Sequence, residues 1–123
     1  LFERVTKYFI DHLPEDYVPY WDLIFSDGSC EPRDTSAAAI AACGILEMEK
    51  YYHNQEFLDI AKKMMSSLSE KYTTVDYLQS NGIIKDGMYS RKHGHKSECT
   101  SWGDYFYLEA LMRMKKSDWK IYW

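Results

Sequence analysis

Long hydrophobic runs are missing from this sequence, and so is an excess of positive charge. No apolar stretch approaches the ~20 residues that a membrane-spanning helix needs, so we expect no membrane partner. The formal net charge is -4, whereas nucleic-acid-binding domains usually present a basic face, so we expect no nucleic-acid partner. Apolar residues nevertheless make up 46% of the chain, which is typical of a folded globular domain.

Cysteine is scarce, with Cys30, Cys43 and Cys99 and no C-x-x-C spacing among them. An odd number of cysteines without paired spacing supports neither a disulfide framework nor a zinc signature. Unpaired thiols are typical of a reducing compartment, so we expect a cytoplasmic protein. The sequence also has no Ser-His-Asp order, P-loop or H-E-x-x-H motif, so spacing alone names no reaction.

The chain begins at Leu1 in sequence that already has helical periodicity. The apolar positions of this stretch are Phe2, Val5, Phe9 and Leu13. They predict a helix over 2–13, which Pro14 prevents from continuing. We expect a piece cut from a longer protein, with the 123 residues forming part of one domain.

Two further helices are predicted to form a hairpin. Asp34 is a good N-cap for a helix over 35–52, which is apolar on nearly every face from 37 to 46 and is therefore expected to be enclosed. Asn54 caps a helix over 55–72 that has one apolar stripe and one charged face, as in a surface helix. The short link between them predicts an αα-hairpin.

The apolar residues from 73 to 99 follow neither a helical nor a strand periodicity. Asn81-Gly82 and Asp86-Gly87 predict turns in this segment, and a short hairpin is predicted over 83–89. Ser101 and Asp104 then fit a capping box before a second enclosed helix over 102–115. Enclosed and exposed helices alternate, which predicts an all-α array. An α-solenoid and a closed α/α toroid both fit.

A basic cluster, YSRKHGHK at 89–96, precedes the second enclosed helix, and Arg33 precedes the first. If the two helices run parallel, their N-termini open on the same end. Free N–H groups and a partial positive charge at helix N-termini favour anions. We therefore predict an anionic ligand at this end, with Trp102 or Tyr105 as a stacking plate.

Less specific roles remain open for the same residues. Arg91 and Lys92 are commonly solvated loop charges, and Trp102 is more often a core residue than a sugar plate. Asp34 and Asp104 fit helix caps better than catalytic acids, because each lies at a predicted helix start.

Metal binding is a weak alternative for the basic cluster. His93 and His95 have i, i+2 spacing, but only Glu98 or Cys99 is near in sequence as a third ligand. This does not match the known ligand patterns, so we expect no metal site.

Four phrases resemble the C-terminal part of the unsaturated glucuronyl hydrolases, glycoside hydrolase family 88. They are LPEDYVPYWDL, PRDTSAAAIAACGILEM, DGMYS and ECTSWGDYFYLEALMRM…WKIYW, in order over nearly the whole chain. The resemblance implies an (α/α)6 barrel, in which residues 1–123 are the C-terminal part and contribute about two helical hairpins plus long loops.

The resemblance also implies a reaction. Enzymes of this family release a 4,5-unsaturated uronic acid from the non-reducing end of lyase-generated oligosaccharides by protonating the C4=C5 double bond and adding water at C5. One aspartate serves as general acid and base, and a second positions it. No metal or organic cofactor is needed.

In the family both aspartates lie upstream of the region matched by this chain, so we assign no catalytic residue here. Ser90 matches a serine that faces the sugar next to the uronate. His93 and His95 stand where some members have a serine and a lysine for a sulfated sugar. Together with Arg33 and Trp102, these are the predicted substrate-binding residues, and they would form a wall of the pocket.

Two functions are carried forward. The first is a glycoside hydrolase acting on unsaturated uronyl oligosaccharides, whose missing N-terminal part completes the barrel. The alternative is a non-catalytic α-helical repeat or carbohydrate-binding module. An open barrel segment should also expose apolar surface, so we expect self-association of this piece.

Overall fold

The computed structural model describes residues 1–91, 97–116 and 118–121. Within these ranges the chain is all-α, with four helices, no strand and three isolated antiparallel bridges. The helices are α1 (Phe2–Asp11), α2 (Thr35–Met48), α3 (Gln55–Lys71) and α4 (Ser101–Lys115). None of them combines the length and apolar character that a membrane span requires.

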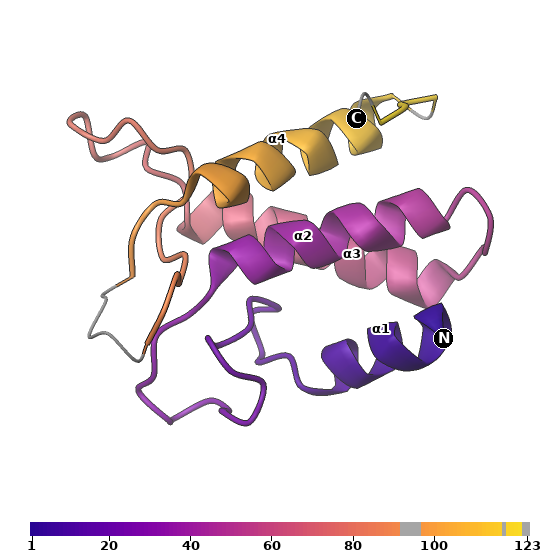
Figure 1. The fold of residues 1–123 in the computed structure, drawn as a ribbon, viewed down its shortest axis with the longest axis horizontal. Helices are drawn as coiled ribbons and strands as arrows, with labels where there is room; N and C mark the ends of the chain where they lie inside the picture. The colour runs from indigo at the N-terminus through magenta and orange to yellow at the C-terminus, as the bar shows by residue number, and fades with distance from the viewer. Residues whose placement is uncertain (92–96, 117, 122–123) are drawn as a thin grey trace.

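Helix α2 lies at the centre of the fold, between α1 and α4 and against α3 (Figure 1). Its small side chains let neighbours approach closely, and Ala38, Ala39 and Ala42 are fully buried. The side chain of Asp34 accepts hydrogen bonds from the first turn, as predicted for an N-cap. The prediction of an enclosed helix is confirmed only in part, because the helix ends at Met48 instead of 52 and Ile40 is 42% exposed.

Helix α3 returns antiparallel to α2 and buries only one face (Figure 1). Met64, Met65 and Leu68 fill the core on that face. The side chain of Asn54 accepts from the N–H of Phe57 at 3.1 Å, so the predicted cap is present. The predicted αα-hairpin is therefore confirmed.

Helix α1 ends at Asp11, short of the predicted limit, and covers part of the same core. Phe2 packs edge-to-face on Phe57 of α3, with ring centroids 6.1 Å apart. Val5 does not follow the predicted stripe, because it is 58% exposed. The stripe thus marks the packed face only in part.

Helix α4 runs parallel to α2, as the site hypothesis required, but it is not enclosed (Figure 1). Tyr107 and Ala110 are buried, whereas Tyr105 and Leu108 are 45% and 47% exposed. The prediction of a second enclosed helix is therefore wrong for the described residues. The sequence pattern reports how apolar a helix is, whereas the elements packed on it decide which faces are covered.

Local predictions failed between α3 and α4. In the described segment 72–90 the turns lie at 75–76 and 78–79, and neither Asn81-Gly82 nor Asp86-Gly87 forms one. No hairpin spans 83–89, because Ile84 bridges to Thr73 and Gly87 bridges to Glu98. Long-range pairing overrides the local turn preference in this loop.

The prediction of a capping box formed by Ser101 and Asp104 before α4 is also wrong. Thr100 is the N-cap, and its side chain accepts from the N–H of Gly103 at 3.2 Å. Asp104 is free to bind elsewhere, and it does so in the loop that precedes α4, as described below.

Candidate functional site

The N-terminal ends of α2 and α4 meet at one end of the fold. A Cβ placed on Gly103 would lie 3.2 Å from Cβ of Ser36 and 2.7 Å from Oγ1 of Thr100. Only a residue without a side chain permits this approach. The N-terminal ends of the two helices therefore lie on the same side, which the sequence prediction of an anion site presupposed, but the caps Asp34 and Thr100 already bind N–H groups of each first turn.

Asp34 joins the start of α2 to the loop that precedes α4. Its Oδ1 accepts from the N–H of Ser36 at 3.1 Å and from Ser36 Oγ at 2.5 Å. The same oxygen accepts from the N–H of Met88 at 3.2 Å. A predicted cap is thus also a long-range anchor.

Asp104, in the first turn of α4, binds the same loop at a second place. Its Oδ1 accepts from the N–H groups of Ile83 and Ile84, each at 3.0 Å. Two hydrogen bonds to one charged oxygen fix the loop strongly, because charge-assisted bonds are about twice as strong as neutral ones. Sequence reasoning missed this role, since the partners lie about 20 positions away.

Two aromatic rings stand at this end. Tyr89 and Trp102 have ring centroids 6.0 Å apart and planes inclined at 51°. Tyr89 is 67% exposed and Trp102 is 38% exposed, so both aromatic side chains are accessible at the surface. Ser90 follows Tyr89 and is half-buried. Trp102 is therefore not a core residue in the described structure, and Tyr89 joins it as a residue that the sequence reasoning did not select.

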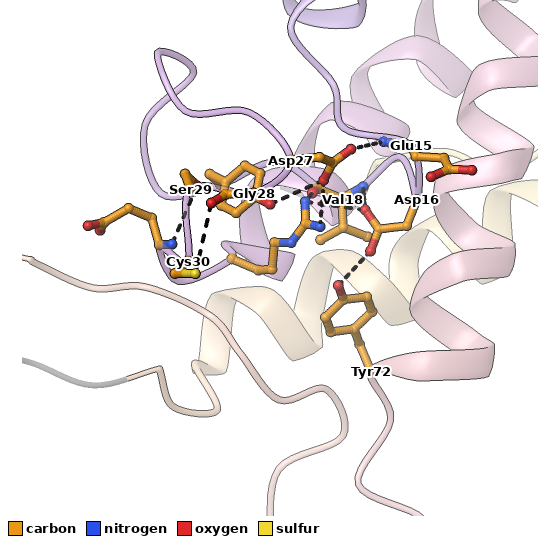
Figure 2. Close-up of polar contacts among 11 residues, drawn as sticks. Glu15, Asp16, Val18, Asp27, Gly28, Ser29, Cys30 and Tyr72 are labelled. Atoms are coloured by element: carbon orange, nitrogen blue, oxygen red, sulfur yellow. Dashed lines mark hydrogen bonds and ion pairs between the residues drawn. The ribbon is translucent and has the colours of Figure 1, made fainter.

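Arg33 lies in a network of the loop between α1 and α2, part of which is drawn in Figure 2. Its Nη1 donates to the carbonyl of Val18 at 2.8 Å and lies 3.3 Å from Asp16 Oδ1. Its Nη2 lies 3.3 Å from Asp27 Oδ1, and the guanidinium carbon sits 3.9 Å from the ring centroid of Tyr20. Arg33 thus has several protein partners, and its role as a substrate residue stays a prediction.

Two pKa shifts show how this network is held. The hydrogen bond from the N–H of Glu15 lowers the pKa of Asp27, with Tyr20 and Arg33 acting in the same direction. Burial raises the pKa of Tyr72, and its hydrogen bond to Asp16 at 2.7 Å raises it further (Figure 2). Tyr72 therefore stays a neutral donor and ties the loop to the end of α3.

The basic cluster is described only in part. Nε of Arg91 lies 3.4 Å from Oε2 of Glu31, and the same oxygen accepts from Trp21 at 2.8 Å. Arg91 is therefore paired with an acidic group of the neighbouring loop. His93 and His95 lie outside the described residues, so their predicted roles stay predictions.

No group of three or more potential metal ligands is found within the described ranges. His93 and His95 lie outside those ranges, so this finding does not apply to them. The expectation that the site holds no metal stays a prediction.

No protein-family model matches the chain. Among curated proteins, it is 46% identical to the unsaturated chondroitin disaccharide hydrolase of Streptococcus agalactiae, over all of this chain and 32% of that protein. It is 38% identical to the unsaturated glucuronyl hydrolase of Bacillus sp. GL1, over 93% of this chain and 32% of that protein.

Solved structures agree with these relatives. The unsaturated glucuronyl hydrolase of S. agalactiae superposes with a TM-score of 0.88 at 46% identity, covering 96% of this chain and 33% of that one. The enzyme of Bacillus sp. GL1 gives 0.85 at 36% identity, covering 94% and 32%. One structure of the S. agalactiae enzyme is a mutant complexed with dGlcA-GalNAc6S.

The fold is therefore that of a segment of an (α/α)6 barrel enzyme. The resemblance to the unsaturated glucuronyl hydrolases, inferred above from four phrases, is confirmed over essentially the whole chain. The chain spans about a third of the length of the relatives it matches, 32% for the first of them.

Proposed function

We propose that this chain is part of a glycoside hydrolase that releases 4,5-unsaturated uronic acid from the non-reducing end of oligosaccharides made by polysaccharide lyases. The observation that carries the proposal is the 46% identity to an unsaturated chondroitin disaccharide hydrolase over the whole chain. The aromatic pair at the shared end of α2 and α4 supports it, because exposed aromatic faces suit sugar rings.

The proposed reaction is hydration rather than direct displacement at the anomeric carbon. A general acid delivers a proton to C4, and the general base takes a proton from water as its oxygen bonds to C5. The resulting hemiketal opens to a ketone at C5. This leaves C1 as a hemiacetal, which expels the remaining sugar as an alcohol and becomes an aldehyde.

In this proposal the chain contributes a wall of the substrate pocket and no catalytic residue. Ser90 offers a hydroxyl to the sugar next to the uronate, and Trp102 offers a ring face. Arg33 remains a candidate for the substrate carboxylate, although its guanidinium already contacts Asp16 and Asp27. His93 and His95 are proposed to adjoin a sulfate position.

The partner that completes the pocket is proposed to be the N-terminal part of the same barrel. Exposed apolar residues along α4, among them Leu108 and Leu111, are the surface on which it would pack. The two catalytic aspartates are expected to come from that part.

The testing experiment follows the absorbance of the C4=C5 bond when the complete protein is mixed with an unsaturated chondroitin disaccharide. Loss of absorbance together with release of the second sugar is the expected result.

A Ser90→Ala variant should raise the KM for the disaccharide, whereas Ser66→Ala, on the exposed face of α3, should leave KM unchanged. Binding of the disaccharide without loss of absorbance would favour the carbohydrate-binding module instead. Activity should survive exhaustive chelation, because no metal is required.

A further inference from the structure

The N-cap and the first residue of α2, Asp34 and Thr35, hold the loop before α4 at three places. Asp34 accepts from the N–H of Met88 at 3.2 Å. The Thr35 hydroxyl donates to the carbonyl of Lys85 at 2.8 Å, and the N–H of Thr35 donates to the carbonyl of Asp86 at 3.1 Å. Thr35 is fully buried, so these bonds are shielded from water.

The backbone of the loop adopts an unusual conformation between these anchors, although it forms no turn there. Asp86 has a φ of 63°, in the left-handed region that residues with a side chain adopt at a cost. The anchors on either side hold this conformation. The contact of Asp34 with Met88 is the last of these anchors before Tyr89 and Ser90, and it lies next to the pair of backbone hydrogen bonds between Gly87 and Glu98.

We propose that Asp34 is a positioning residue for the substrate pocket, which sets the affinity for the sugar next to the unsaturated uronate by fixing Tyr89 against Trp102 and, with it, the neighbouring Ser90. The inference rests on the proposed function above. Asp34 itself touches no substrate in this account. The donors to its side chain in the described part of the chain converge on Oδ1: the N–H and Oγ of Ser36 and the N–H groups of Ala37 and Met88.

The capping role and the positioning role of Asp34 are separable by side-chain length. Serine is as good an N-cap as aspartate, but its oxygen is attached one carbon nearer the backbone. Asp34→Ser therefore keeps a cap for Ser36 and Ala37 and withdraws the acceptor from Met88. Asp34→Asn keeps an acceptor oxygen at the same place and removes only the charge.

Asn54→Ser supplies the matched control. Asn54 caps α3 through the N–H of Phe57, and that helix end adjoins the connection to the opposite end of α2 (Figure 1). The substitution changes a cap by the same chemistry as Asp34→Ser. Among the described residues, the loop contact of the Asn54 side chain is with Tyr52, in the connection between α2 and α3 and not in the segment 86–90. Any effect common to both variants reports helix stability alone.

The experiment measures KM and kcat of the complete protein for an unsaturated disaccharide, together with amide hydrogen exchange of the segment 86–90. Asp34→Ser is expected to raise KM about tenfold, the ratio that corresponds to 1.4 kcal/mol, and to leave kcat within about twofold. Exchange in 86–90 should quicken by a similar factor. Asp34→Asn and Asn54→Ser should stay within about twofold of the unmodified protein in both measurements.

Three results would overturn the proposal: an unchanged KM in Asp34→Ser, an equal rise in Asn54→Ser, or an Asp34→Asn variant as impaired as Asp34→Ser. Failure of the unmodified protein to consume the disaccharide would count against the proposed hydrolase alone. The same variants are then compared by their Kd for the disaccharide, and Asp34→Ser must still bind about tenfold more weakly than Asp34→Asn.

Discussion

Arg113 and Glu109 form a buried ion pair within α4, in which Nη2 lies 2.6 Å from Oε1. The two side chains are 4% and 5% exposed. Arg113 also contacts Glu47 of α2, so the guanidinium joins the two parallel helices far from the end that carries Trp102.

Removing Arg113 should destabilise the chain severely. Arg113→Ala leaves Glu109 buried without its partner, and such changes typically cost about 3–5 kcal/mol. The double variant Glu109→Leu, Arg113→Met should lose much less, because no charge remains buried between them. Urea unfolding of the three proteins checks this, and equal losses in the single and double variants would contradict it.

Substitution by alanine should change the stability of the chain in opposite directions at two glycines, one in α4 and one in α2. Gly103→Ala brings a Cβ to 2.7 Å from Oγ1 of Thr100, the N-cap of the same helix, and to 3.2 Å from Cβ of Ser36 on α2. The cap and the contact between the two helices must both give way, so the change should destabilise the chain by about 1–3 kcal/mol. Gly44→Ala meets nothing within 4 Å and should stabilise α2 by up to about 1 kcal/mol. Thermal unfolding of both variants of this chain gives the comparison.

The three thiols should differ in reactivity. Burial raises the pKa of Cys43 to about 12, so its thiolate is negligible near neutral pH. Cys30 and Cys99 are exposed. A thiol reagent at neutral pH should therefore label two cysteines in the folded chain and the third only after denaturation. Rapid labelling of Cys43 in the folded chain would show that the packing of α2 on α4 is looser than described.

Residues 1–123 alone should not hydrolyse unsaturated disaccharides. The proposed acid and base lie outside this piece, and losing general acid–base help typically costs 10²–10⁴-fold or more. The exposed face of α4 should also make the piece self-associate, which light scattering after size-exclusion chromatography would measure. Turnover near that of the complete protein would refute the assignment of catalysis to the missing part.

His93 and His95 should make sulfate selectivity depend on pH. Their reference pKa of about 6.5 means that they gain charge as pH falls toward and below this value. Discrimination in favour of sulfated disaccharides should therefore be weak at neutral pH and grow at lower pH. His93→Ala and His95→Ala, each assayed in the complete protein on sulfated and unsulfated disaccharides, provide the measurement. Changes in kcat/KM below about twofold in both variants would exclude a selectivity role.

Much of the fold could be predicted because its signals are local. The caps Asp34 and Asn54 and the apolar pattern of α2 depend on neighbouring residues, and each was found in the structure as predicted. The capping box at Ser101 failed by one position, because Thr100 offers an equivalent hydroxyl. Either Thr100 or Ser101 could have capped α4 by its local chemistry. In the structure Thr100 is the cap, and Gly103 then packs closely on Ser36 of α2.

The candidate site could be predicted only in outline. The resemblance selected Ser90, and the helix pattern suggested that the N-termini of two helices meet. The pairing of Tyr89 with Trp102, and the bonds from Asp34 and Asp104 to the loop, join residues far apart in sequence. The same is true of Arg33, whose partners in the loop were not foreseen.

The sequence by itself thus determined where the helices lie, which face of α3 is apolar and which family the chain resembles, because periodicity, capping and motif phrases are properties of short segments. Only the tertiary structure decided which faces are covered and where the loop side chains point. The covered faces and the directions of the loop side chains depend on which residues, distant in sequence, form hydrogen bonds with each buried N–H group and carboxylate. Helix α4 illustrates the difference: its sequence is apolar on most faces, but the elements packed on it in the described residues bury only one of them.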